Sequence, residues 1–146
     1  MRIPLAASAL RRSVYLLGGA VVFLWLRIEE PAVAPAALIG WGVSGWLIAD
    51  WVLRRFGGQR LAATGWCALL SLTGSAIGLG AALAAAGLML LKNGLHGHVV
   101  PDFPFGVIAE TLARMPAWGI AGLLAGLGLA LALLALPSRP PTDPSA

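Results

Sequence analysis

The sequence predicts an all-α integral membrane protein with four transmembrane helices and a short interfacial amphipathic helix before the last of them. The stretch from Leu61 to Leu91 contains no Asp, Glu, Lys, Arg or His, and about 20 predominantly apolar residues suffice to cross a bilayer. Only 11% of the chain is charged, whereas soluble domains carry about 25% charged residues. With 146 residues, the chain has the length of one compact domain. We therefore expect a single helical bundle over residues 1–136.

The first span is expected over residues 13–28. At about 16 residues this stretch is slightly short, but Arg11 and Arg12 precede it and their side chains can snorkel, which extends it by a turn. A basic start, an apolar middle and the small residues 32–34 also give it the layout of a signal peptide. Charged residues just before that small-residue run and a proline just after it disfavour cleavage.

The second span is expected over residues 31–53. Pro31 and Pro35 suit the first turn of a helix, where a missing N–H leaves no hydrogen bond unmade. Asp50 lies four residues before Arg54, so the two side chains share a helix face and can form an interfacial ion pair. The basic turn that follows contains two glycines, which end the helix.

The third span is expected over residues 62–91, inside the uncharged stretch from Leu61 to Leu91. As a continuous helix that stretch would be about 46 Å long, against a hydrocarbon core of about 30 Å. The helix must therefore tilt, project beyond the membrane or end early, and two spans do not fit in it.

The remaining chain is expected to form an outer loop, a surface helix, a span and a tail. Residues 92–104 are polar and contain Pro and Gly, as in a loop. Apolar residues recur at helical spacing over residues 105–115, which favours an amphipathic helix in the interface. Residues 117–136 form an uncharged fourth span, and the Pro-rich residues 137–146 are expected to be disordered.

Basic residues predict the orientation, because the more basic side of a membrane protein is cytoplasmic. One side would carry Arg2, Arg11, Arg12, Arg54, Arg55, Arg60 and Arg139, and the other Arg27, Lys92 and Arg114. Both termini are then cytoplasmic, and the loop at 92–104 faces outward. The net charge of +4 accordingly suggests contact with lipid headgroups rather than nucleic acid. A composition rich in Arg, Ala, Gly and Leu points to a bacterial inner membrane protein.

Two rows of small residues recur every four positions in the third and fourth spans. Such rows let helix backbones approach closely, and packing of this kind holds membrane helices together. The rows could pack the four helices of one chain, or one of them could bind another membrane protein or a second copy. If Gly78 lies at a close helix contact, we expect Gly78→Leu to push the backbones apart and Gly78→Ala to be milder than Gly78→Leu. The rows consist of Gly74, Gly78, Ala82 and Ala86, and of Gly122, Gly126 and Ala130.

The outer loop region contains a weak candidate metal site formed by His96, His98 and Asp102. Histidine and carboxylate are ordinary ligands for zinc and copper. The set is incomplete, because the chain has no further histidine. We therefore expect no bound metal, and histidines that hydrogen-bond to loop carbonyls or headgroups instead.

Chemically active sets are missing from the sequence, so we expect no catalytic residues, no cofactor and no enzyme activity. The spans hold no Ser-His-Asp set, no paired carboxylates and no phosphate-binding loop. Small size, the two rows and the outer loop favour a non-catalytic accessory subunit or assembly factor of a larger membrane complex. One alternative is an oligomeric channel or transporter whose pore is lined by the glycine faces. Another is a metal-handling membrane protein or enzyme that uses the outer loop.

Overall fold

We describe the protein from a computed structural model, which places residues 8–28, 32–96 and 100–136. These residues form helices without any strand. The predictions that concern Arg2, Arg139, His98 and the tail at 137–146 lie outside the described residues. The helices are α1 (Ser8–Arg27), α2 (Val33–Phe56), α3 (Ala63–His96), α4 (Phe105–Ala113) and α5 (Met115–Ala135).

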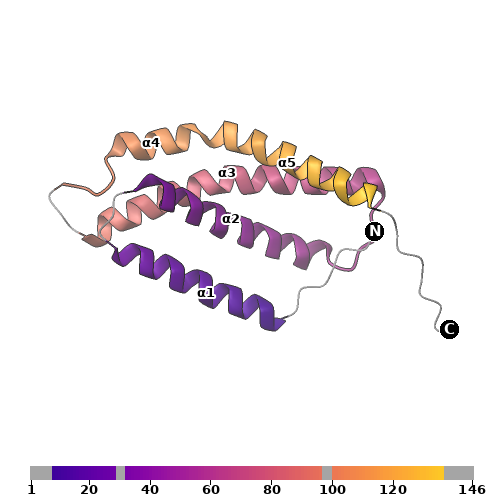
Figure 1. Cartoon of the computed structure of the whole chain (residues 1–146), viewed down its shortest axis with the longest axis horizontal. Helices are drawn as coiled ribbons and strands as arrows, with labels where there is room; N and C mark the ends of the chain where they lie inside the picture. The colour runs from indigo at the N-terminus through magenta and orange to yellow at the C-terminus, as the bar shows by residue number, and fades with distance from the viewer. Residues whose placement is uncertain (1–7, 29–31, 97–99, 137–146) are drawn as a thin grey trace.

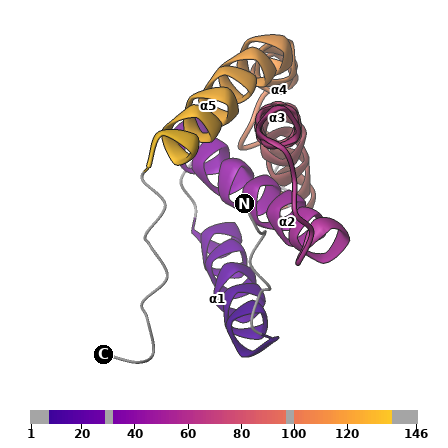
Figure 2. The ribbon, with the colours of Figure 1, turned by 90° about the vertical axis from the view of Figure 1, so that its right-hand side faces the viewer.

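Helices α2, α3 and α5 form the packed body of the protein, and α1 lies to one side of it (Figures 1 and 2). The centre of this body is α3, which packs extensively against both α5 and α2. Helix α1 runs alongside α2 but touches it sparsely. The arrangement therefore separates a close-packed three-helix unit from a first helix that makes few backbone contacts and is held by side chains near its two ends.

Three helices are long and apolar enough to cross a membrane, not four. They are Val33–Phe56, Ala63–His96 and the combined helix Phe105–Ala135. The predicted span at 13–28 is therefore wrong by this measure. The reason lies in the arginines: Arg11, Arg12 and Arg27 bound an uncharged stretch in α1 that spans only about 20 Å at 1.5 Å per residue, short of a hydrocarbon core of about 30 Å.

The predicted interfacial helix is present as α4, but it does not lie apart from the last span. Helix α4 leads directly into α5, and the two follow nearly the same direction (Figure 1). Arg114 joins them in the right-handed helical region, with φ −80° and ψ −7°. Pro116 falls in the first turn of α5, where its missing N–H is tolerated. The proline therefore allows a bend without a turn of the chain, and α4 extends α5 instead of lying across it.

The predicted small-residue rows of α3 and α5 pack against each other. A methyl group added at Gly74 would overlap the carbonyl of Gly122, and one added at Gly78 would overlap the carbonyl of Trp118. A methyl group at Gly126 would meet the carbonyl of Leu70 in the same way. Only glycine permits this approach of two backbones. These glycines are therefore occupied by packing within the chain and are not a partner surface while the fold is intact.

The alanines of the same rows are buried as well. Ala82, Ala86 and Ala130 are each at most 3% exposed. Ala86 belongs to the main apolar cluster, together with Ile108 of α4. This packing extends the contact between α3 and the α4–α5 helix beyond the glycines.

Helix α2 meets α3 through a second contact between small residues. A methyl group at Gly40 would lie 2.7 Å from the carbonyl oxygen of Ala81 and 2.9 Å from the nitrogen of Ala85. Ser44 Oγ donates a hydrogen bond of 3.0 Å to the carbonyl of Ile77. Packing and an interhelical hydrogen bond thus fix α2 on α3, since hydrophobicity alone does not drive association in lipid.

Candidate functional site

Two clusters that contain charged side chains lie at the two ends of the bundle, and the first of them surrounds Asp50. This carboxylate, on α2, is only 1% exposed. Arg54 Nη2 lies 2.7 Å from Oδ2, which brings together the pair expected from the i, i+4 spacing. Arg11 Nε of α1 lies 2.7 Å from Oδ1, and the Tyr15 hydroxyl donates a 2.8 Å hydrogen bond to Oδ2. Asp50 therefore ties α1 to α2 at this end.

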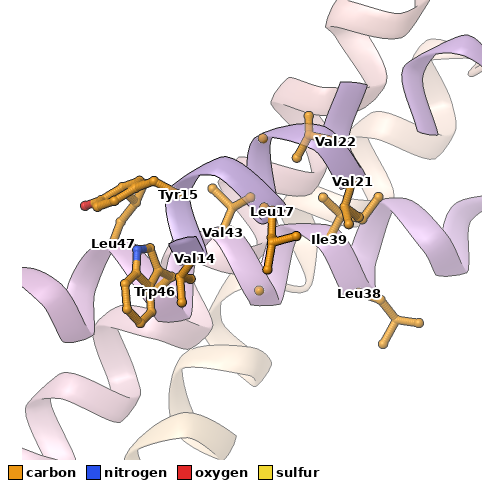
Figure 3. Close-up of a pocket in the computed structure, with 13 residues that line it drawn as sticks. Val14, Tyr15, Leu17, Val21, Val22, Leu38, Ile39, Val43, Trp46 and Leu47 are labelled. Atoms are coloured by element: carbon orange, nitrogen blue, oxygen red, sulfur yellow. The ribbon is translucent and has the colours of Figure 1, made fainter. Parts of the chain in front are cut away.

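An apolar groove begins beside this cluster and runs between α1 and α2 (Figure 3). Its volume is about 510 Å³. Tyr15 and Trp46 stand at one end, and Val22 and Ile39 lie at the other. The rings of Tyr15 and Trp46 meet edge to face with 5.9 Å between centroids. The groove exists because α1 and α2 present glycines to it where larger side chains would close the gap: Gly18, Gly19 and Gly42 have no other side chain or distant backbone atom within 4 Å of the position of an added methyl group.

Lys92 marks the second cluster, at the opposite end of the bundle. The sequence pattern predicted that this residue belongs to the outer loop, but the structure extends α3 to His96 and buries Lys92 completely. The ammonium nitrogen lies 4.6 Å from the ring centroid of Trp25 and 5.8 Å from that of Phe103. An ammonium over aromatic faces gains cation–π attraction, which increases when water is excluded.

Asn93 fixes the loop over this cluster. Its side-chain Nδ2 donates to the carbonyl of Phe103, its Oδ1 accepts from the N–H of Phe103, and both distances are 2.8 Å. Phe103 is consequently held at 1% exposure against Trp25. The loop therefore returns to α3 at a defined point, before α4 begins.

The candidate metal ligands are partly brought together. His96 Nδ1 and Asp102 Oδ2 lie 2.5 Å apart, and His98 lies outside the described residues. Among those residues no group of three His, Cys, Asp or Glu side chains has the arrangement of a metal site. His96 and Asp102 thus connect the end of α3 to the loop, as Asn93 does through its hydrogen bonds to Phe103.

Sequence reasoning missed Arg11, Tyr15, Lys92 and Asn93. Arg11 and Tyr15 lie four residues apart, the spacing at which two side chains share a helix face, and that spacing was available in the sequence. Nothing in the sequence indicated that this face meets Asp50, which lies 35 residues from Tyr15. Comparison with known protein families, characterised proteins and solved structures finds no match.

Proposed function

We propose that this protein is a small non-catalytic accessory subunit or assembly factor of a larger membrane complex in a bacterial inner membrane. The observation that carries the proposal is the position of the two buried charged residues among those described, Asp50 and Lys92, each of which holds elements of the fold together. Asp50 binds α1 to α2 at one end, and Lys92 lies under the loop at the other. Transporters and pumps place such residues along a route through the membrane. Here they join helices at the ends of the bundle.

The channel alternative has weaker support from this geometry. It requires the glycine faces to line a pore, whereas Gly74 and Gly78 of α3 are in backbone contact with α5. The metal-handling alternative is also less favoured, because His96 and Asp102 are engaged with each other. An accessory role requires instead an outer surface to which another membrane helix can bind.

Helix α5 offers a surface of that kind on a face that its contact with α3 leaves open. Its members are small, recur at helical spacing and are exposed, and Gly128 has open space around it. Small residues let a second helix approach closely. This surface, the outer α5 face, consists of Ala121, Ala125, Gly128 and Ala132.

Gly128→Leu is expected to separate the protein from its partner without unfolding it. The leucine side chain would project from the outer α5 face into the space that a partner helix would occupy. The measurement is co-purification from native membranes, followed by native gels and mass spectrometry. Gly87→Leu is the matched control, because Gly87 is also exposed with open space but lies on α3. A chain that purifies without any larger partner, or equal recovery of the partner with both variants, contradicts the proposal.

The orientation is part of the same proposal: both termini are cytoplasmic, the Asp50 end faces the cytoplasm and the loop before α4 faces outward. It requires that α1, although its uncharged stretch is short, passes through the bilayer beside α2, from Arg11 at the Asp50 end to Trp25 at the Lys92 end. Its support is the positive-inside rule, since Arg54 and Arg55 lie in the last turn of α2 and Arg60 follows that helix. We expect reporter fusions after Gly58 and at the C-terminus to report a cytoplasmic location, and a fusion after Asp102 to report the outside. An external signal after Gly58 would reverse the assignment.

A further inference from the structure

The groove between α1 and α2 has an apolar lining, and a charged cluster adjoins one end of it, the charged end. Arg11 and Arg54 are ion-paired with Asp50, and Tyr15, which lines the groove, donates a hydrogen bond to the same carboxylate. The rest of the lining is aliphatic or glycine, apart from Trp46. A ligand that fills the whole groove must therefore be apolar over most of its length and anionic at one end.

The charged end keeps capacity for a second anion. Two guanidinium groups share the single carboxylate of Asp50, so the cluster carries excess positive charge. Arg54 is 56% exposed and Arg11 is 31% exposed, whereas Asp50 is 1% exposed. A guanidinium has five N–H donors, and its fork matches phosphate geometry. The exposed donors of Arg54 can therefore bind a phosphate in front of the buried carboxylate.

An indole ring lies one helical turn deeper. Trp46 lines the groove and packs edge to face on Tyr15. Four residues separate Trp46 from Asp50, a rise of about 6 Å along α2. The interfacial layer of one leaflet is about 5–7 Å deep.

We propose that the α1–α2 groove binds one anionic phospholipid. The phosphate binds Arg54 and Arg11, the rings of Tyr15 and Trp46 lie beside the glycerol region, and one acyl chain lies over Gly42 and Gly18. The order of chemical groups, from guanidinium to aromatic rings to aliphatic floor, matches the change from headgroup to acyl chain along a phospholipid. This site is independent of the accessory role proposed above and requires only that the chain lies in a membrane.

A neighbouring helix is the competing occupant, and the charged end distinguishes the two. An apolar helix face would fill the aliphatic part of the groove but would bring no phosphate to Arg54. A lipid satisfies both parts, so the groove should discriminate between lipids by headgroup charge. If a helix of another chain occupied the groove instead, side chains that fill the groove would change the oligomeric state of the protein.

Binding of spin-labelled lipid to the full-length protein in phosphatidylcholine vesicles tests the proposal. The probes are phosphatidylglycerol and phosphatidylcholine that carry the same acyl-chain label. We expect a motionally restricted signal with about fivefold preference for phosphatidylglycerol, a preference that Arg54→Gln reduces severalfold. Gly42→Leu should remove the site, because leucine enters the open space of the groove without meeting the backbone. Gly18→Leu should do the same from α1, and Gly87→Leu is the control that leaves the signal unchanged.

Four results would overturn the proposal. The first two are equal restriction of the two lipids and a signal that persists in both groove-filling variants. The third is a change of oligomeric state in those variants, which would assign the groove to a helix, and the fourth is displacement of the lipid by inorganic phosphate. Thermal unfolding of each variant shows whether the fold is retained, and the two glycines lie on different helices, so a folding defect in one leaves the other informative. Addition of inorganic phosphate should not displace the lipid; displacement would show an anion site without lipid specificity.

Discussion

Gly78→Leu is expected to destabilise the protein far more than leucine at an exposed glycine does. A side chain at this position enters the backbone of α5, where an added methyl group overlaps the Trp118 carbonyl and lies 3.0 Å from the nitrogen of Gly119. Backbone atoms cannot rotate away as a flexible side chain does. Overpacking typically costs about 1–3 kcal/mol, and leucine should exceed this range because the two helices must separate along their main contact.

Gly78→Ala is expected to be milder than Gly78→Leu but still destabilising. The Cβ atom alone produces the overlap, so alanine should lower the free energy of unfolding by about 1–3 kcal/mol. Reversible unfolding in mixed micelles measures both variants. Gly87→Ala and Gly87→Leu are the controls, since Gly87 has open space and should show little loss. If both Gly78 variants unfold like the wild-type protein, the close contact between α3 and α5 is incorrect.

Phe103→Ala is expected to cost about 3–5 kcal/mol, the usual range for removal of a buried phenylalanine side chain. Phe103 is 1% exposed and packs on Trp25, with the Lys92 ammonium 5.8 Å from its ring. Its loss creates a cavity over the end of α1 and removes one aromatic face from a fully buried charge. The hydrogen bonds from Asn93 go to the backbone of residue 103, so they do not depend on the ring.

Phe105→Ala is the matched control for this variant. The two phenylalanines are two residues apart, but Phe105 is 76% exposed, so its truncation should change the free energy of unfolding only slightly. Unfolding under identical conditions compares the two. Equal losses would mean that the buried position of Phe103 is wrong, and a loss only for Phe103→Ala supports the cluster around Lys92.

The helices could be predicted because apolar composition and helical spacing are local properties. The uncharged stretch that became α3 and the i, i+4 relation of Asp50 and Arg54 are written in neighbouring residues. The close approach of α3 and α5 was one of two alternatives that the glycine spacing allowed. Which small-residue row contacts which helix depends on the angle and position at which two helices cross. The residue pattern of one helix does not determine that crossing.

The end of α3 could not be predicted because its polar residues resemble a loop. Lys92 and Asn93 follow an apolar stretch, and polarity there usually marks the membrane surface. Their partners, Trp25 and Phe103, lie far along the chain or across a loop. Tertiary contacts thus prolong the helix beyond the point at which composition suggests a stop. The same limitation hid the meeting of Arg11 and Tyr15 with Asp50.

The unequal apolar lengths of neighbouring helices have a consequence for the surrounding bilayer. The uncharged stretch of α3, from Ala63 to Leu91, is about 44 Å long and that of α5 is about 32 Å long, whereas the arginines of α1 bound a stretch of only about 20 Å. In a bilayer, lipids that border α3 would therefore meet a longer hydrophobic surface than lipids that border α1. Mismatch of either sign is relieved by tilt or by a local change in bilayer thickness. The protein is accordingly expected to impose a gradient of thickness across its own width, with the bilayer thinnest beside α1.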